Sequence, residues 1–363
     1  MSKPNVLILG GVGFIGRNLV QYLVEQKCCN KIRVADKVLP ATAFLGAKHL
    51  EAFADPSVEY MQGNLASAAS ITKCFTLEGG KFNIVFNLAG ETKYGQTDAV
   101  YNEKVYDVSV KCATEAAKVG VDKFIEVSTA QIYSSNKKPS KEGDKTDPWT
   151  LIASHKLKAE KALKEINGLN LIIVRPSVVY GPGDILGISP RIITGAVYKH
   201  TNEKMKFLWD GDLKYNTVHV NDVCKALWFL SQNGKVGDVY NLSDKGDTDA
   251  QTISKILEKI FAIKTGFVGN MLSNVASLKM KDVCEEVNDK HLKPWSDLCK
   301  DKGISNTPLT PYIDQELLSN THLSVDGTAI EGLGFKYDNP EITEALVREQ
   351  IDYFINQNLF PKF

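Results

Sequence analysis

The chain has 363 residues, of which 43% are hydrophobic and 24% charged, as in an ordinary soluble globular protein. Lysine plus arginine and aspartate plus glutamate number 43 each, so no excess charge favours nucleic acid or a membrane surface as a partner. No window approaches the roughly 20 apolar residues that a membrane span needs. We therefore expect a cytoplasmic protein that binds neither nucleic acid nor membrane.

The seven cysteines are odd in number, and no pair has the Cys-x-x-Cys spacing of a zinc or redox site. Cys28 and Cys29 are adjacent, which is a poor geometry for a structural disulfide. We expect free thiols in a reducing compartment and no bound metal.

Short β-rich runs alternate with helical patterns over the first half of the chain, which is typical of a parallel sheet with crossover helices. Most of the runs are nearly all apolar, as expected for strands covered on both faces. The expected strands are 6–9, 32–35, 59–62, 84–88, 124–127 and 171–174, and helices are expected over 98–119 and 153–166. The pattern predicts an α/β fold, with residues 1–175 forming a doubly wound, Rossmann-type nucleotide-binding domain.

The second half is less regular. Residues 216–230 read as a strand followed by a helix, and 252–263 and 340–354 are helical by periodicity, whereas 265–320 has no clean period. We expect 214–242 to return to the nucleotide-binding domain. Residues 176–213 and 243–363 would then form a smaller, discontinuous C-terminal substrate domain.

A glycine-rich turn follows the first strand in "VLILGGVGFIG", with Gly10, Gly13 and Gly16 at three-residue spacing. The first glycine allows a tight turn, the second lets backbone amides approach a pyrophosphate, and the third permits close helix–strand packing. Twenty residues after Gly16, Asp36 ends the second strand. A carboxylate there accepts from ribose hydroxyls and repels a 2′-phosphate, so the pattern predicts binding of NAD rather than NADP.

Six further motifs follow in order: "NLAG" (87–90), "FIEVSTAQIY" (124–133), "KLKAE" (156–160), "RPSVVYGPGD" (175–184), "VHVNDV" (218–223) and "DGTAIEGLGF" (326–335). Together with the glycine turn, they resemble the extended short-chain dehydrogenase/reductase family. That family comprises NAD-dependent epimerases, dehydratases and sterol-type dehydrogenases. By position, the resemblance implies that the dinucleotide contacts Gly10, Gly13, Phe14, Ile15, Gly16, Asp36, Asn64, Leu65, Leu88, Ala89, Gly90, Lys156, Pro176 and Val178.

The resemblance also implies a mechanism. In such enzymes a tyrosine exchanges the proton, a lysine four residues later binds the nicotinamide ribose, and a Ser or Thr hydroxyl bonds the substrate oxygen. Lys156 and Thr129 stand at two of these positions, but Ile152 stands where the tyrosine is expected. Since a positioned acid–base contributes roughly 10²–10⁴-fold to a rate, the usual mechanism would be severely impaired.

Three other side chains could replace the tyrosine. Tyr133 forms a Y-x-x-x-K string with Lys137, but its place just after the fifth strand favours a structural role. His155 lies about 100° around the helix from Lys156, which favours a solvated or capping role. Tyr94 follows the fourth strand, in a loop that lines the substrate side in relatives, and is the better candidate.

The substrate positions depart from relatives that act on nucleotide sugars. Val178 stands where those relatives usually have asparagine, and Tyr215 where they often have a diphosphate-binding arginine. Because a diphosphate favours bidentate guanidinium contacts, these departures favour a less charged alcohol or ketone. Lys214, Arg191 and Lys204 are nevertheless candidates for binding an anion.

Two functional hypotheses stay open. The first is an NAD-dependent oxidoreductase, epimerase or dehydratase with an altered proton donor, acting on a small molecule. The second is a catalytically inactive NAD-binding sensor or scaffold. The family resemblance further implies a homodimer, joined through the helices near 98–119 and 150–166.

Overall fold

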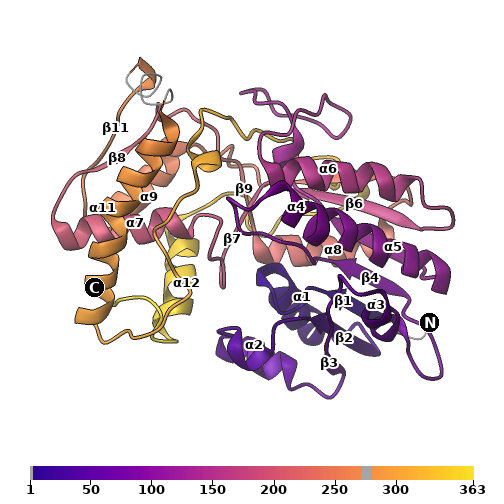
Figure 1. The fold of residues 1–363 in the computed structure, drawn as a ribbon. Coiled ribbons are helices and arrows are strands. Elements are labelled where there is room, and N and C mark those ends of the chain that lie inside the picture. The colour runs from indigo at the N-terminus through magenta and orange to yellow at the C-terminus, as the bar shows by residue number, and fades with distance from the viewer. Residues whose placement is uncertain (1–2, 272–278) are drawn as a thin grey trace.

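A seven-stranded parallel sheet forms the centre of the computed structural model, which describes residues 3–271 and 279–363 (Figure 1). The strand order is β10-β6-β5-β4-β1-β2-β3, so the direction of winding reverses between β1 and β4. In open α/β sheets ligands bind beyond the carboxyl ends of the strands at such a reversal. The strands are β1 (Asn5–Leu9), β2 (Lys31–Asp36), β3 (Val58–Gln62), β4 (Ile84–Asn87), β5 (Lys123–Val127), β6 (Leu171–Pro176) and β10 (Val239–Leu242).

All six strands predicted for the first half are present, with each end within two residues of its predicted place. The predicted α/β fold class is confirmed. The strand β10 comes from the second half of the chain and pairs with β6, so the segment 239–242 extends the sheet.

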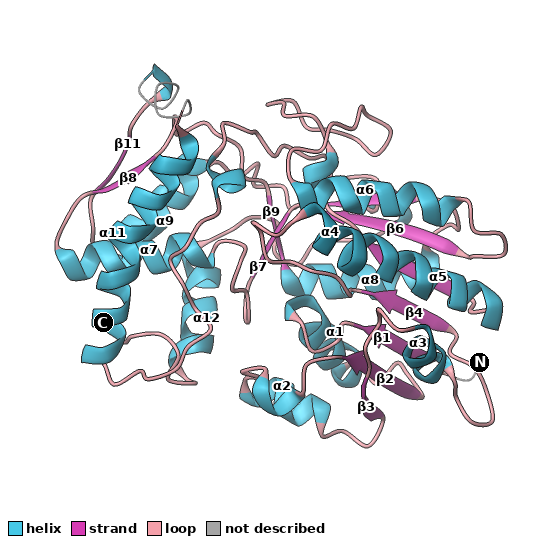
Figure 2. Cartoon of the chain, in the orientation of Figure 1, coloured by secondary structure: helices cyan, strands magenta, loops and turns pink. Residues whose placement is uncertain are grey.

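Helices cover both faces of the sheet (Figure 2). One face packs against α1 (Phe14–Glu25), α2 (Ala47–Phe53) and α8 (Val220–Asn233). The other packs against α3 (Ala68–Phe75), α5 (Val108–Val119) and α6 (Leu151–Lys164). Because every central strand is covered twice, its apolar residues all lie in one of two cores, which explains the continuous apolar runs in the sequence.

The helix expected over 98–119 is interrupted. It begins as α4 (Asp98–Tyr101), continues as the π-helical stretch η2 (Asn102–Asp107) and ends as α5. Within η2 the carbonyl of Lys104 accepts a hydrogen bond from the amide of Glu91, 3.2 Å away in the loop after β4. A π-bulge of this kind changes the bonding of single carbonyls without ending a helix, so it leaves no mark on hydrophobic periodicity.

The remaining elements gather at one end of the molecule, as Figure 1 shows on its left. They include α7 (Ser189–Thr201), α9 (Ala250–Phe261), α11 (Met280–Asp301) and α12 (Glu344–Ile355), with a small sheet of β8 (Met205–Phe207) and β11 (Thr265–Phe267). A third sheet pairs β7 (Val178–Tyr180) with β9 (Thr217–His219) between the two parts.

The long helix α11 occupies much of the stretch for which the sequence predicted no element. Its buried face includes Asn288 and His291 among the apolar residues, and Pro294 lies inside the helix, so the apolar period is broken. Residues 272–278 of the same stretch lie outside the described part of the chain.

Two expectations from composition can be compared with the structure. All seven cysteines are free thiols. Within residues 3–271 and 279–363, none of the helices combines the length and the apolar character needed to cross a membrane.

Candidate active site and nucleotide cleft

A cleft of about 590 Å³ opens beyond the carboxyl ends of the central strands, at the reversal between β1 and β4. Its walls come from the glycine turn, the end of β2, the loop after β4, the end of β5, helix α6 and residues 176–187. A segment far along the chain closes the opposite side through Pro308, Leu317, Ser319, Thr321 and Leu323. The cleft therefore lies between the sheet and the C-terminal part.

The glycine turn leaves the start of α1 facing this cleft. Gly10 has a φ of +74°, and a Cβ at Gly16 would lie 2.5 Å from the Cα of Gly11, so both positions require glycine. Helix α1 begins at Phe14, and its N-cap Gly13 supplies no side-chain cap. Uncapped first-turn amides combined with the helix dipole form an anion site, which fits a pyrophosphate.

Asp36 lies at the carboxyl end of β2 and lines the cleft with 9% of its surface exposed. Its two carboxylate oxygens accept hydrogen bonds from the amides of Val12 and Val38, each 3.0 Å away. The nearby Arg17 also lines the cleft, but its guanidinium donates to the carbonyls of Val12 and Phe44. The carboxylate is thus held in place at the wall of the cleft.

The floor of the cleft brings together Thr129 and Lys156. The Oγ1 of Thr129 accepts from the amide of Gln131 at 3.2 Å. The Nζ of Lys156 donates to the carbonyl of Val127 at 2.8 Å and lies 3.6 Å from the carboxylate of Glu126. Both predicted catalytic positions therefore face one space, beside the dinucleotide turn.

Ile152 does not line this space. It is buried in a small apolar cluster with Tyr101 and Val105, and Tyr94 packs against the same cluster. The side chain that stands four residues before Lys156 therefore contributes packing and no polar group.

Tyr94, by contrast, lines the cleft. Its hydroxyl accepts from the Nε2 of Gln131 at 2.9 Å and donates to the Oε1 of Gln131 at 3.2 Å. That Oε1 also accepts from Thr150 at 3.1 Å. Burial raises the pKa of Tyr94 to about 12. The phenol is consequently protonated at neutral pH, which suits donation of a proton better than its removal from a substrate.

The other two sequence candidates have structural partners outside the cleft. The Nε2 of His155 lies 2.9 Å from Asp98. The hydroxyl of Tyr133 donates to Asn241 and accepts from Arg175, both at 2.7 Å, in a buried network. Neither residue lines the cleft.

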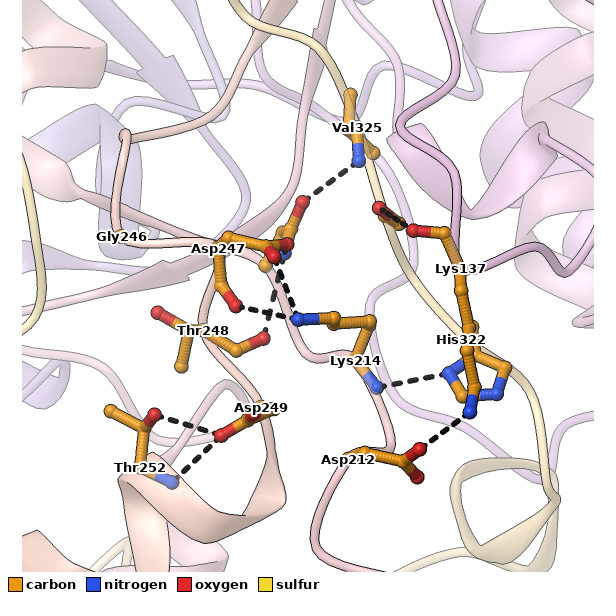
Figure 3. A network of polar contacts seen from close by, with 12 residues as sticks. Lys137, Asp212, Lys214, Gly246, Asp247, Thr248, Asp249, Thr252, His322 and Val325 are labelled. Carbon is orange, nitrogen blue, oxygen red and sulfur yellow. Dashed lines mark hydrogen bonds and ion pairs between the residues drawn. The ribbon is translucent and has the colours of Figure 1, made fainter.

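Of the three candidate anion-binding residues, Arg191 lines the cleft. Its guanidinium stacks on the ring of Tyr215, 4.5 Å from the ring centre, and Tyr215 lines the cleft as well. Lys214 instead pairs with Asp247 at 2.7 Å, in the polar network drawn in Figure 3. Lys204 is exposed and lies beside Gly266 on β11.

Most of the residues predicted to contact the dinucleotide line the cleft, and three do not. Asn64 is exposed, and its side-chain oxygen accepts from the amide of Ala66 at 3.1 Å. Leu65 and Ala89 are buried in the core beneath. The residues that do line it are Gly10, Gly13, Phe14, Ile15, Gly16, Asp36, Leu88, Gly90, Lys156, Pro176 and Val178.

Sequence reasoning missed Glu126 and Gln131. Glu126 is a carboxylate within the otherwise apolar strand "FIEV", a pattern that signals a buried partner and could have been recognised. Gln131 carries no comparable signal, because its role depends on the approach of Tyr94 from a different loop.

Comparison with known proteins identifies the family. The model of the "NAD dependent epimerase/dehydratase family" matches residues 6–243. The chain belongs to this family. This match begins in β1 and ends just after β10, so it covers the whole seven-stranded sheet.

Relatives within the family include the human dTDP-D-glucose 4,6-dehydratase, which is 29% identical over 264 residues, covering 69% of this chain and 72% of that protein. A trifunctional UDP-glucose 4,6-dehydratase/epimerase/reductase of Arabidopsis thaliana is 25% identical over 278 residues, or 72% of this chain. The match spans only 40% of the length of that plant protein.

Solved structures share the fold over nearly the whole chain. The UDP-N-acetylglucosamine 4-epimerase of Methanobrevibacter ruminantium, in complex with UDP-N-acetylmuramic acid, superposes with a TM-score of 0.70 at 20% identity, covering 98% of this chain and 100% of that one. A dTDP-glucose 4,6-dehydratase double mutant of Streptomyces venezuelae, with NAD bound, gives 0.70 at 18% identity, with 97% of each chain covered.

Proposed function

We propose that this protein binds NAD in the cleft and uses it to reduce or oxidise an alcohol- or ketone-bearing small molecule, with Tyr94 as the proton donor. The observation that supports this best is the position of the Tyr94 side chain. It lines the same cleft as Thr129 and Lys156 while packing against Ile152, the residue at the position expected for the usual tyrosine.

The residues at the glycine turn and at the end of β2 fit the cofactor. The first-turn amides of α1, from Gly13 to Ile15, would bind the pyrophosphate, and Asp36 would accept from the adenosine ribose hydroxyls. Lys156 would donate to the nicotinamide ribose. When bound, NAD supplies the hydride chemistry.

The proton would come from Tyr94. Thr129 would hold the substrate oxygen by a hydrogen bond, and the Tyr94 O–H would transfer its proton to that oxygen as a carbonyl is reduced. The amide of Gln131, 2.9 Å from the Tyr94 oxygen, would then stabilise the phenolate. Burial raises the pKa of Tyr94 to about 12, so at neutral pH its hydroxyl is in the protonated form that can donate.

The substrate side supports a molecule with less charge than a sugar nucleotide. Arg191 stacked on Tyr215 offers one guanidinium to a single anionic group, and Val178 adds an apolar contact. The relatives act on UDP- and dTDP-linked sugars by name, so those compounds belong in any substrate screen beside uncharged ketones.

Cofactor binding is tested first. A ligand at 100 times its Kd stabilises the fold by about 2.7 kcal/mol, so a thermal-shift scan should show a clear rise in Tm with NAD and NADH. NADP should give a smaller rise, because Asp36 repels its 2′-phosphate. A scan in which neither NAD nor NADH raises the Tm would end the proposal.

The proton donor is tested by Tyr94→Phe. In an assay that follows absorbance of the reduced nicotinamide with a panel of ketones and nucleotide sugars, kcat should fall by roughly 10²–10⁴-fold. Tyr106→Phe is the matched control, because Tyr106 lies on η2 under Lys158 and outside the cleft. Equal rates in wild type and Tyr94→Phe would remove Tyr94 from the mechanism.

The second candidate function is an NAD-binding sensor. The apolar packing of Ile152 favours it, since the position expected for the acid carries no polar group. A clear NAD-induced rise in Tm together with no turnover of any panel member would support the sensor over the enzyme.

A further inference from the structure

A buried carboxylate lies beneath the cleft, in the middle of the sheet. Glu126 is in β5 with 1% of its surface exposed, and both faces of that strand are covered by helices. An ionised carboxylate without partners would be very costly there. Its partners therefore indicate what it does.

Both oxygens of Glu126 accept hydrogen bonds. Oε2 accepts from the side-chain amide of Asn87 at 2.5 Å, and Oε1 accepts from the hydroxyl of Ser109 at 2.8 Å. The Nζ of Lys156 lies 3.6 Å from Oε1. The donors on both oxygens and the ammonium beside them favour the ionised form of Glu126, whereas burial favours the protonated form.

The surroundings of this carboxylate contain few other charged or titratable groups. Burial raises the pKa of Glu126, while the Lys156 ammonium and the two hydrogen bonds oppose that rise. Glu160 on α6 adds a repulsive charge, but it is itself paired with Arg175 of β6 at 2.6 Å. Cys112 of α5 also faces Glu126, and burial raises the pKa of that thiol.

Two neighbouring residues of β5 contact the ammonium of Lys156. This ammonium donates a hydrogen bond to the carbonyl of Val127 and forms an ion pair with Glu126. Gly90 approaches the same nitrogen, since a Cβ there would lie 3.8 Å from it. Lys156 also lines the cleft.

We propose that Glu126 is a positioning residue that keeps Lys156 charged and aims its ammonium at the ribose of the bound dinucleotide. The inference rests on the proposed NAD binding and adds the residue on which the lysine depends. A compensating carboxylate matters because Lys156 is only 12% exposed at its side chain, so water does little to stabilise its charge.

The test is Glu126→Gln, which preserves size and removes the charge. Without the carboxylate, burial favours the neutral amine of Lys156, so the variant should lose NAD affinity as the pH rises. Calorimetric titration at constant ionic strength should give a Kd that increases about tenfold or more between pH 7 and 9.5, the size of one charge-assisted hydrogen bond. The Kd of the wild type should stay within about twofold over that range.

A second readout needs no cofactor. Competitive labelling with acetic anhydride, followed by mass spectrometry, reports the fraction of each lysine present as free amine. In Glu126→Gln, Lys156 should become reactive at a lower pH than in the wild type, while exposed lysines such as Lys293 keep their profile.

Glu160→Gln is the matched control. Glu160 is equally buried and also paired with a cation, but its partner Arg175 lies outside the cleft. This variant should lower the Tm without changing the pH profile of Lys156. If Glu126→Gln does not fold, Glu126→Asp should retain the flat pH profile and bind NAD more weakly, because the charge remains but moves away from the ammonium.

The outcomes separate the two proposals. A wild type that does not bind NAD, combined with the expected shift in labelling, overturns the proposed function and leaves the pairing of Glu126 with Lys156 intact. A wild type that binds NAD, with identical labelling and Kd profiles in Glu126→Gln, overturns the positioning role. An unchanged NAD affinity in Glu126→Asp overturns it as well.

Discussion

At the scale of single residues, the side chain of Ile152 packs in the core and offers no polar group to the cleft. Its side chain is 8% exposed and lies against Tyr101, Val105 and Tyr94. A larger side chain at this position must displace one of these rings. The absence of an acid at position 152 is therefore built into the core that supports Tyr94.

Restoring a tyrosine should consequently destabilise the protein. We expect Ile152→Tyr to lower the free energy of unfolding by about 1–3 kcal/mol, the usual cost of overpacking a core. Urea denaturation of the variant beside Ile152→Leu, which nearly conserves volume, measures the difference. A variant as stable as the wild type would mean that the cluster has room for a tyrosine.

Asp244 gives a prediction about pH. It is buried, accepts from Thr217 at 2.8 Å and from the amide of Gly246 at 2.9 Å, and burial raises its pKa from 3.8 to about 7. The native state thus prefers the protonated carboxyl. Its contribution to stability is fully present below pH 3.8 and is lost as the pH rises through 7.

Asp244→Asn imitates the protonated form. We expect the Tm of this variant, relative to the wild type, to be higher at pH 8.5 than at pH 5.5. Differential scanning calorimetry at both values is sufficient. A Tm difference that is the same at the two pH values would contradict the assignment.

At the scale of elements, two glycines of the turn between β1 and α1 have different roles, one in folding and one in binding. A Cβ at Gly16 would lie 2.5 Å from backbone atoms of Gly11, whereas the nearest atom to a Cβ at Gly13 is 3.2 Å away, at the carbonyl of Gly10. Gly13 also lies at the N-cap, where an anion would approach.

The two alanine variants should therefore differ. Gly16→Ala should cost about 2 kcal/mol or more in stability, because packed backbone must move. Gly13→Ala should fold with a much smaller loss and still reduce the NAD-induced rise in Tm. Thermal scans with and without NAD compare the two, and equal stability losses would refute this division of roles.

The elements also differ in how well periodicity predicts them. The strands were predictable because burial on both faces requires apolar residues throughout. Helix α11 was not, because Asn288 and His291 on its buried face bond to Ile313 and Tyr198 rather than packing as apolar groups. Tertiary partners of that kind are invisible in a hydrophobic pattern.

At the scale of the whole molecule, three of the buried histidines lower the stability of the protein in acid. Burial lowers the pKa of His49 to about 3, and that of His219 and His291 to about 4, from 6.5. At these three rings the native state therefore binds fewer protons than the unfolded chain. Their contribution is fully present above pH 6.5 and is lost as the pH falls toward 4 and then 3.

We expect the Tm of His291→Gln, relative to that of the wild type, to be higher at pH 4 than at pH 6.5. His291 is the most suitable of the three for substitution, because it lies on α11, away from the cleft. A pH profile of the variant that runs parallel to that of the wild type would contradict the role of this ring.

Assembly is the remaining expectation at this scale. Helices α5 and α6 pack side by side on one face of the sheet and are predicted to form the contact between two copies. Solution scattering should then give a mass of about twice 40.0 kDa. A mass of one chain would contradict the homodimer.

The sequence by itself determined the sheet, the dinucleotide turn and the family, because these depend on local spacing: a glycine every third residue, a carboxylate at a strand end, and apolar runs of strand length. Only the tertiary structure decided which side chains lie together at the candidate site. Tyr94 after β4 meets Gln131 after β5 in the cleft, and Glu126 of β5 lies beside Lys156 of α6 beneath it. Which of them carries a proton, and which a fixed charge, follows from burial and from partners that lie far apart along the chain.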